Sequence, residues 1–355
     1  MNISEMLLSE KEEDRLYAVE RIKQDGLTEF ADDLIDILKK DTSEMARESA
    51  METLKTFTSP DVSKKIAKLF EEDDPFLRNA AVTILAAHWE APLASLSTYM
   101  KSENKHIRKL ALDSLHATGN PLVVDLIATA LKDEDINNVI SAVEYIADLE
   151  GYRYADSIAD ILKKAEDPFL LATCLEALAK IGNKYASQVV HDRFPDPAQL
   201  PDFLLFSYLR FIAHVGDEGR LPDLLKIVDM KGAVVYKECI DVIHSILDRC
   251  GDDLSALSKK TIENILFELL SLNIPPMNKY ECLVMLGSLR GKRAIEMLHR
   301  SLKDQNPFVR MGAIEGIGKI GSKESIPILE ELAAIEKNED VKAVIQDVLN
   351  MLGKK

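Results

Sequence analysis

The pattern of hydrophobic and polar positions recurs along the whole chain at an interval of about 30 residues. In the clearest copy, Asn306 is a favourable N-cap and Pro307 fits the first helical position, where no backbone donor is needed. Ala313 and Ile317 lie four residues apart and therefore share one face of the helix, and Gly321 supplies a left-handed end. This copy predicts one short helix with both of its ends marked.

Aligning the chain on Arg310 gives an anchor position in each copy. The anchors are Arg15, Arg47, Arg78, Arg108, Val139, Leu171, Leu205, Tyr236, Lys279, Arg310 and Lys342. The residue seven positions after the anchor is Ile or Leu every time. These residues are Ile22, Leu54, Leu85, Leu115, Ile146, Leu178, Ile212, Ile243, Leu286, Ile317 and Leu349. A large aliphatic residue in all eleven copies predicts one buried position per helix.

Three other positions keep the same register. Three residues after the anchor the side chain is small, in Ala18, Ala50, Ala81, Ala111, Ala142, Cys174, Cys239, Cys282 and Ala313, with Tyr208 and Ile345 as exceptions. Four residues before the anchor are the expected N-caps Ser43, Asp74, Asn104, Asp135, Asp167, Asn306 and Asn338. Eleven residues after it are the expected terminators Gly26, Gly119, Gly182, Gly216, Gly321 and Gly353.

A period of this length, with a cap, a small core residue, a large core residue and a terminator in register, predicts helical pairs that bury their faces against their neighbours. We therefore expect an all-α fold, an α-solenoid of about ten to eleven stacked helical pairs. Residues 1–355 are expected to form a single solenoid. The second helices are expected at Phe30 to Lys40, Val62 to Glu71, Pro121 to Lys132, Arg153 to Lys164, Ala294 to Lys303 and Ile326 to Ala334.

The stretches Asp-Pro-Phe-Leu-Arg-Asn-Ala-Ala (74–81) and Asn-Pro-Phe-Val-Arg-Met-Gly-Ala (306–313) resemble HEAT repeats, specifically the short bacterial kind similar to those of phycobilisome lyases. The resemblance covers nearly the whole chain. It implies a superhelix whose second helices line a concave surface, where a protein partner would bind. The family includes scaffolds, chaperone-like subunits, a few lyases and a few DNA-binding enzymes, so the resemblance predicts the architecture far more sharply than the activity.

Residues 194–203 interrupt the period with three prolines, which cannot lie inside a helix. One interpretation is a loop that compensates for a shortened second helix. The other is a projecting loop that presents Phe194, Leu200 and Phe203 to a partner, because a proline-stiffened loop loses little entropy on binding. We include Trp89 and Tyr154 with these three residues as candidate partner-binding residues.

Two more departures from the regular pattern concern the spacing of the anchors and the residue type at the anchor. The anchors Tyr236 and Lys279 are separated by about 12 residues more than their neighbours, and the insert predicts a longer helix or two short ones between Leu254 and Leu272. We expect a structural join between two sub-stacks near 248–278, or a binding element. The four apolar anchors from Val139 to Tyr236 indicate either a drier local core or an apolar strip left for a partner.

Phe76, Phe169, Phe203 and Phe308 share the position two residues before the anchor. They either pack on the linker beside the N-cap or form a surface ladder for a peptide. Three of the four cysteines occupy the small-residue position and are expected to be buried packing residues, because a free Cys behaves as a small hydrophobe.

The formal charge of −16 opposes binding to phosphate backbones and anionic membranes. The chain has no 18-residue apolar run and its first residues are acidic, so we expect a cytoplasmic protein with neither a membrane nor a nucleic-acid partner. No HExxH, His-Glu, CxxC or GxxxxGK[ST] motif occurs. Gly316, Gly318 and Gly321 have the GxGxxG spacing, but this Gly-rich stretch is predicted to lie in a helix, where it allows close packing and does not cradle phosphate. We expect no metal, no cofactor and no catalytic residue. The leading hypothesis is a non-enzymatic scaffold or adaptor that binds a partner protein along its concave surface. The alternative is a lyase-like or chaperone-like subunit that acts on a cofactor-carrying protein.

Overall fold

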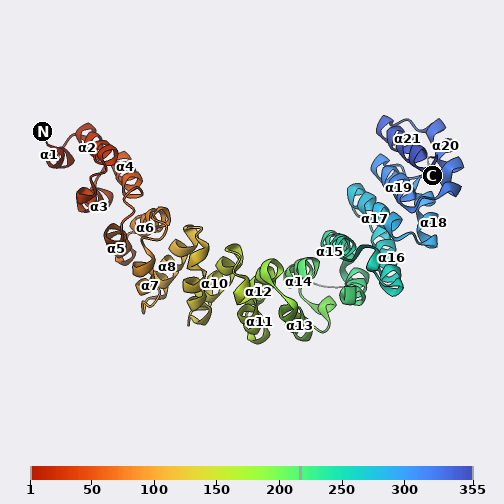
Figure 1. Ribbon diagram of the computed structural model, residues 1–355, viewed down its shortest axis with the longest axis horizontal. Helices are drawn as coiled ribbons and strands as arrows, with labels where there is room; N and C mark the ends of the chain where they lie inside the picture. The colour runs from red at the N-terminus through yellow and green to blue at the C-terminus, as the bar shows by residue number, and fades with distance from the viewer. Residues whose placement is uncertain (1, 216–217, 354–355) are drawn as a thin grey trace. The chain divides into compact units, whose positions relative to one another are not determined.

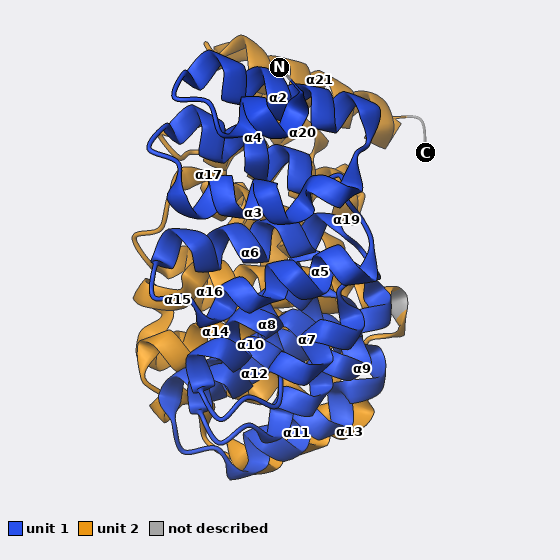
Figure 2. Cartoon of the chain, turned by 90° about the vertical axis from the view of Figure 1, so that its left-hand side faces the viewer, with its two compact units in different colours: residues 1–181 blue, residues 182–355 orange. Residues whose placement is uncertain are grey.

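The computed structural model describes residues 2–215 and 218–353, and every regular element in these two ranges is a helix (Figure 1). The chain divides into two compact units, Met1–Ile181 and Gly182–Lys355, which Figure 2 shows in different colours. The all-α prediction is confirmed, whereas the sub-stack join near 248–278 stays a prediction.

Unit 1 begins with the short helix α1 (Ile3–Leu7) and continues as helical pairs in two layers (Figure 1). The first helices of the pairs are α2 (Glu12–Asp25), α4 (Glu44–Leu54), α6 (Pro75–Ala87), α8 (Lys105–Ala117), α10 (Ile136–Asp148) and α12 (Pro168–Ile181). The second helices are α3 (Ala31–Lys40), α5 (Pro60–Ala67), α7 (Leu93–Tyr99), α9 (Val124–Ile127) and α11 (Ala155–Lys164). Short 3₁₀ turns extend several of them, namely η1 (Thr28–Phe30), η2 (Lys68–Glu71), η3 (Pro121–Val123), η4 (Ala128–Lys132) and η5 (Tyr152–Tyr154).

Unit 2 continues the same alternation with one irregularity. Its α-helices are α13 (Lys184–Arg193), α14 (Asp202–Val215), α15 (Leu221–Cys250), α16 (Ala256–Ser271), α17 (Pro276–Leu289), α18 (Lys292–Ser301), α19 (Pro307–Ile320), α20 (Ile326–Ile335) and α21 (Glu339–Gly353). Its 3₁₀ turns are η6 (Pro197–Gln199), η7 (Glu218–Arg220), η8 (Gly251–Asp253) and η9 (Lys323–Ser325). Helix α15 contains the second helix of one pair and the first helix of the next pair in one continuous element. The two parts meet at Val235, whose φ of −113° and ψ of 18° are not helical. The predicted insert forms the single helix α16.

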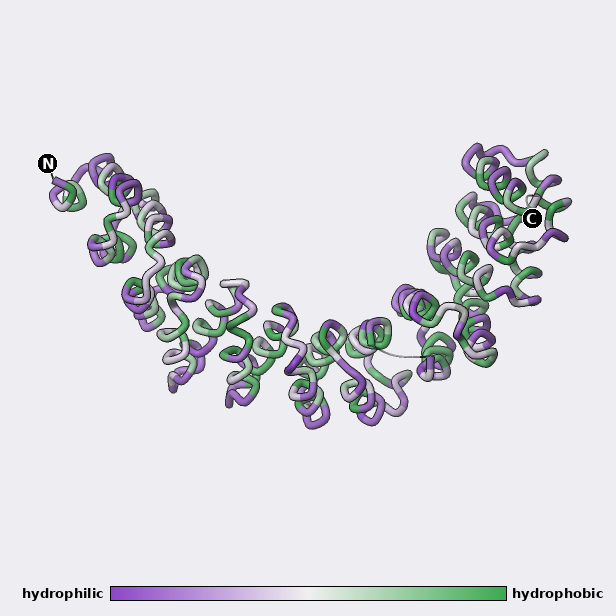
Figure 3. The backbone as a smooth tube through the Cα atoms, in the orientation of Figure 1, coloured by the Kyte–Doolittle hydropathy of each residue, from purple (hydrophilic) through white to green (hydrophobic). Residues whose placement is uncertain are grey.

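The predicted core register is confirmed in both units. The residue seven positions after the anchor is at most 1% exposed in ten of the eleven copies, and the small residue three positions after the anchor is fully buried in all nine. Within each unit the helices contact mainly their neighbours along the chain. Hydrophobic and hydrophilic stretches alternate along the helices in Figure 3, as expected when each helix buries one side.

All seven predicted N-caps of the first helices accept a hydrogen bond from a backbone N–H of the first turn.

The C-terminal ends of the first helices are left-handed at residues other than glycine as well. Gly26, Gly119 and Gly321 have φ between 62° and 76°, but Trp89, Glu150 and Arg290 take φ of 55° or 56° at the equivalent position. The stack therefore imposes the left-handed end even on side chains that disfavour it. Gly353 is the last residue of α21, and Gly216 lies outside the described residues.

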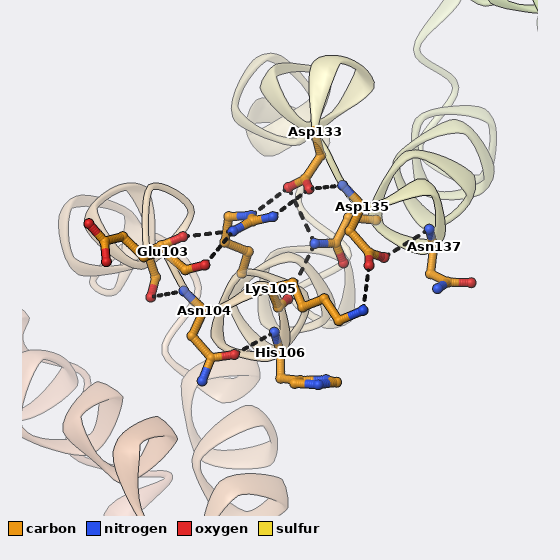
Figure 4. Close-up of polar contacts among 10 residues, drawn as sticks. Glu103, Asn104, Lys105, His106, Asp133, Asp135 and Asn137 are labelled. Carbon is orange, nitrogen blue, oxygen red and sulfur yellow. Dashed lines mark hydrogen bonds and ion pairs between the residues drawn. The ribbon is translucent and has the colours of Figure 1, made fainter.

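The anchor arginine links three consecutive segments of the stack. Arg108 donates from Nη1 to the carbonyl oxygens of Ser102 and Glu103, and its Nε and Nη2 donate to both carboxylate oxygens of Asp133 at 2.7 Å (Figure 4). Asp133 also accepts from the backbone N–H of Asp135 and from Asn138. Two other arginine–carboxylate pairs repeat this arrangement, Arg15 with Asp41 and Arg310 with Glu336. We call these three pairs the arginine clamps.

The apolar anchors in the middle of the chain replace the clamps with packing. Val139, Leu171 and Leu205 are at most 9% exposed, and Tyr236 is half-buried. Side chains that are covered in this way do not form a surface strip, so the drier local core is the correct alternative.

Glycines bring two helices of unit 2 into backbone contact. A Cβ added at Gly287 in α17 would overlap the Cα of Gly316 in α19, and one added at Gly312 would lie 2.7 Å from the Cα of Tyr280. In the structure these glycines permit a helix–helix approach that any larger residue would prevent.

We predict that Arg108→Gln lowers the free energy of unfolding by about 2–4 kcal/mol, because Asp133 would remain buried without its cation. The hydrogen bonds from Arg108 lower the pKa of Asp133 below its ordinary 3.8. A lowered pKa in the folded state stabilises the fold above the unfolded pKa, and this contribution is lost as the pH falls through the folded pKa. The difference between the wild type and Arg108→Gln should therefore be complete above about pH 5 and shrink below about pH 4.

Urea unfolding at several pH values measures this difference. Arg21→Gln is the matched control, because Arg21 pairs with Asp25 where both side chains are more than 40% exposed. An exposed pair of this kind contributes at most about 1 kcal/mol. Equal destabilisation by the two variants, or a difference that grows in acid, would contradict the role given to the clamp.

Candidate protein-binding surfaces

The structure corrects the prediction for the proline-rich loop. Phe194 was expected to be presented to a partner, but only 6% of it is exposed, and its ring packs edge to face on Tyr208 at a centroid distance of 6.2 Å. Pro197 and Ala198 are also buried. The loop is fixed to α15 by Lys231, which donates to the carbonyl oxygen of Leu200 at 2.6 Å. The segment is a packed connection, which supports the interpretation as a compensating loop.

The other candidates from the sequence keep some exposure. Leu200 is half-buried, and Phe203, at the start of α14, is 49% exposed. Trp89 is 51% exposed and holds the left-handed position described above. It follows His88, which is buried with one ring nitrogen on the hydroxyl of Ser63 and the other on the carbonyl oxygen of Leu54. Trp89 belongs to unit 1 and Phe203 to unit 2.

An apolar ladder lies at the N-terminal ends of the first helices. It consists of the exposed apolar residues two positions before the anchor, each between 40% and 73% exposed. In unit 1 they are Met45, Phe76 and Phe169, and in unit 2 they are Phe203, Val234, Met277 and Phe308. The four phenylalanines were predicted from the anchor alignment, whereas Met45, Val234 and Met277 were not, although the same alignment places them at this position. One member is partly covered, because the guanidinium of Arg47 lies 3.9 Å from the ring centroid of Phe76.

The last candidate, Tyr154, lines a groove of about 810 Å³ in unit 1. The groove runs between η4 and α11 and ends at the start of α12, and we call it the η4–α11 groove. It is lined by Asp125, Ala128, Thr129, Leu131, Lys132, Tyr154, Ser157, Asp160, Ile161, Lys164, Ala165 and Leu170. Tyr154 was a candidate from its sequence, but the groove itself was not predicted, because it depends on the spacing of two neighbouring second helices.

Among the described residues, the acidic side chains of this groove have partners, whereas its two lysine side chains do not. The hydroxyl of Tyr154 donates to Asp125, which also pairs with Arg153. Partial burial, together with this bond to a carboxylate, raises the pKa of the Tyr154 hydroxyl. Within the described parts of the chain, Lys132 and Lys164 form neither a hydrogen bond nor an ion pair. The groove thus contains two available cations and an aromatic wall that is held in place.

The described residues hold no group of three or more His, Cys, Asp or Glu side chains that could ligate a metal. Cys174, Cys239 and Cys282 are buried as expected, and burial raises the pKa of the Cys174 and Cys282 thiols to about 12. These thiols are therefore protonated near neutral pH and are poor nucleophiles. In the part of the chain that the structure describes, no helix combines the length and the apolar character needed to cross a bilayer.

The arrangement of layers corrects one more expectation. The resemblance implied that the second helices line the concave surface. Taken alone, unit 1 bends in Figure 1 so that α4, α6, α8 and α10 lie on the inner side and the second helices on the outer side. The apolar ladder therefore belongs to the inner layer of unit 1, and the η4–α11 groove to the outer layer.

Comparisons with known proteins agree with this architecture. The sequence profile of the family described as "HEAT repeats" matches residues 264–350. A search of curated protein sequences finds no match.

Among solved structures, importin beta in a polyethylene glycol condition is similar at a TM-score of 0.57 and 10% identity, over 99% of this chain and 58% of importin beta. Kap121p bound to RanGTP gives a TM-score of 0.58 at 13% identity, over 99% of this chain and 44% of Kap121p. The karyopherin Kap121p bound to the extreme C-terminus of the protein phosphatase Cdc14p gives 0.56 at 11%, over 99% and 49%. This chain thus spans about half the length of these karyopherins.

The repeat register, the two helical layers and these likenesses define an all-α solenoid. Residues 264–350 match the model of the HEAT-repeat family, and the likeness to importin beta and Kap121p supports the same kind of fold for this chain. Its similarity to the repeats of phycobilisome lyases stays a prediction. The HEAT solenoid fold is typical of protein-interaction scaffolds and is typically non-enzymatic.

The burial of Phe194 and the exposure of Phe203 predict opposite mutational effects. Phe194→Ser should lower the free energy of unfolding by about 3–4 kcal/mol, because it leaves a cavity beside Tyr208. Phe203→Ser should change it by less than about 1 kcal/mol. Chemical denaturation of the two variants tests the assignment. A stable Phe194→Ser protein would restore the projecting loop that the structure rejects.

Proposed function

We propose that this chain is a non-enzymatic scaffold or adaptor that binds another protein through the exposed surfaces of its stacked helices. The observation that carries the proposal is the apolar ladder. Four apolar side chains in unit 2 and three in unit 1 stand at the same repeat position, and each is at least 40% exposed. Scattered apolar residues on a surface need no explanation, but a series in register along successive repeats, as in the four ladder residues of unit 2, is typical of an interaction surface. In unit 1 the polar residues His106 and Asn137 interrupt the series.

The position of the ladder supports a protein partner. Six of the seven ladder residues lie in the first turn of a helix, and Val234 lies inside α15 beside the joint at Val235. The backbone of each ladder residue is therefore already ordered before binding. Side chains on an ordered frame lose less conformational entropy than side chains on a mobile segment. Phenylalanine and methionine are also enriched in the cores of protein interfaces.

The solved relatives give a precedent for the class of partner only. Kap121p has been solved bound to RanGTP and to the extreme C-terminus of Cdc14p, both of which are proteins. Because this chain shares their fold at 10–13% identity and about half their length, the precedent supports protein binding in general. We extend the proposal to the inner layer of unit 1, where the ladder residues Met45, Phe76 and Phe169 lie. No specific observation favours the lyase-like or chaperone-like alternative.

Capture from extracts of the native cell tests the proposal. The bait is the full chain, compared with a ladder variant in which Phe203, Met277 and Phe308 are changed to Ser. The matched control changes three other exposed apolar residues of unit 2 to Ser, Tyr185, Leu257 and Ile335. We expect at least one protein to be recovered equally by the wild type and the control, and at least about fivefold less by the ladder variant. Failure to recover any reproducible partner, or equal recovery by all three baits, would contradict the proposal.

A further inference from the structure

We propose that the η4–α11 groove docks an acidic segment of a partner protein, with an apolar side chain in the groove and carboxylates beside Lys132 and Lys164. This inference rests on the proposed function and specifies the chemistry of the segment that binds unit 1.

The bottom of the groove is apolar. Ala165 and Leu170 are buried, and Leu131 and Ile161 are half-buried, so aliphatic surface remains available from both second helices. At about 810 Å³ the groove can accept one or two large side chains. Burying them there would remove apolar surface on both partners from water, which favours binding by about 25 cal/mol per Å².

The groove is too open to enclose a small molecule. Six of its twelve lining residues are exposed, including Thr129, Ser157 and Lys164 on both sides. A site for a small ligand instead covers most of the ligand's surface. A second groove of about 610 Å³ also contains Thr129 and Lys132, so the hollow continues toward α7. An extended or helical segment that lies across several second helices fits this shape.

The charges select the sign of the segment. Both acidic residues of the groove already have a partner. Asp125 forms an ion pair with Arg153 and accepts a hydrogen bond from the Tyr154 hydroxyl, and Asp160 also takes part in a polar or electrostatic interaction. The two lysines lie at equivalent places, at the ends of η4 and α11, and have no partner among the described residues. A basic segment would therefore meet uncompensated cations, whereas carboxylates would complete two ion pairs.

The acidity of the whole chain does not prevent this interaction. At physiological ionic strength, charges separated by more than about 8 Å are largely screened, so neighbouring groups decide which sign binds. Tyr154 adds a rigid aromatic side to the groove because its hydroxyl is held by Asp125. An aromatic ring that is already fixed provides contact area at little entropic cost.

Selection from a displayed library of random dodecapeptides tests the inference, with the full chain as bait. The charge variant carries Lys132→Glu and Lys164→Glu. The matched control carries Lys163→Glu and Lys303→Glu, two exposed lysines outside the groove, so both variants have the same net charge. We expect the wild type to enrich peptides with Asp or Glu beside Leu, Ile or Phe. Their recovery should fall at least about tenfold on the charge variant and stay within about twofold on the control.

Three results would overturn the inference: no enrichment over an empty bait, enrichment of basic or neutral peptides, or equal recovery on the charge variant and the control. Binding of dodecanoate with the same dependence on the two lysines, without peptide enrichment, would also overturn it in favour of a small amphiphile. Thermal unfolding of both variants confirms that they are folded. If no acidic peptide is enriched but the ladder-dependent capture of a partner from extracts succeeds, this inference is wrong and the proposed scaffold function is unaffected.

Discussion

The structure depends on the burial of one aliphatic side chain per helical pair between that pair and its neighbours. Ile or Leu occupies this position in all eleven copies, and ten of the eleven side chains are at most 1% exposed. No single pair can cover this residue alone, so each pair is stable only within a stack. The N-caps, the left-handed helix ends and the arginine clamps all serve to hold successive pairs in the register that keeps it covered.

The sequence was informative wherever a residue type is tied to a local conformation or to full burial. The N-caps, the anchor register and the buried cysteines were predictable because capping and core packing depend on the residue and its immediate helix. Helix ends were only partly predictable, since Trp89, Glu150 and Arg290 take the left-handed conformation without being Gly or Asn. There the geometry of the stack overrides the local preference.

The surfaces were harder to predict because they depend on relations between repeats. The prolines around Phe194 left both a compensating loop and a projecting loop open, and only the structure shows that Tyr208 from α14 covers Phe194. The η4–α11 groove is formed by residues about 30 positions apart, and nothing in either segment alone indicates it. The apolar ladder was only partly predictable from the sequence. Its phenylalanines were recognised from the alignment, but whether they were packed or exposed required the structure.

The central claim is that each pair is stabilised by its neighbours, and hydrogen exchange on an Ile146→Ala variant tests it most directly. Ile146 is fully buried in α10. Truncating it should cost about 2–5 kcal/mol locally. If the claim is right, amide protection falls in α8, α10 and α12 and remains unchanged in α2 of the same unit. An equal loss of protection from α2 to α12 would show that unit 1 unfolds as one cooperative body, and would contradict the claim.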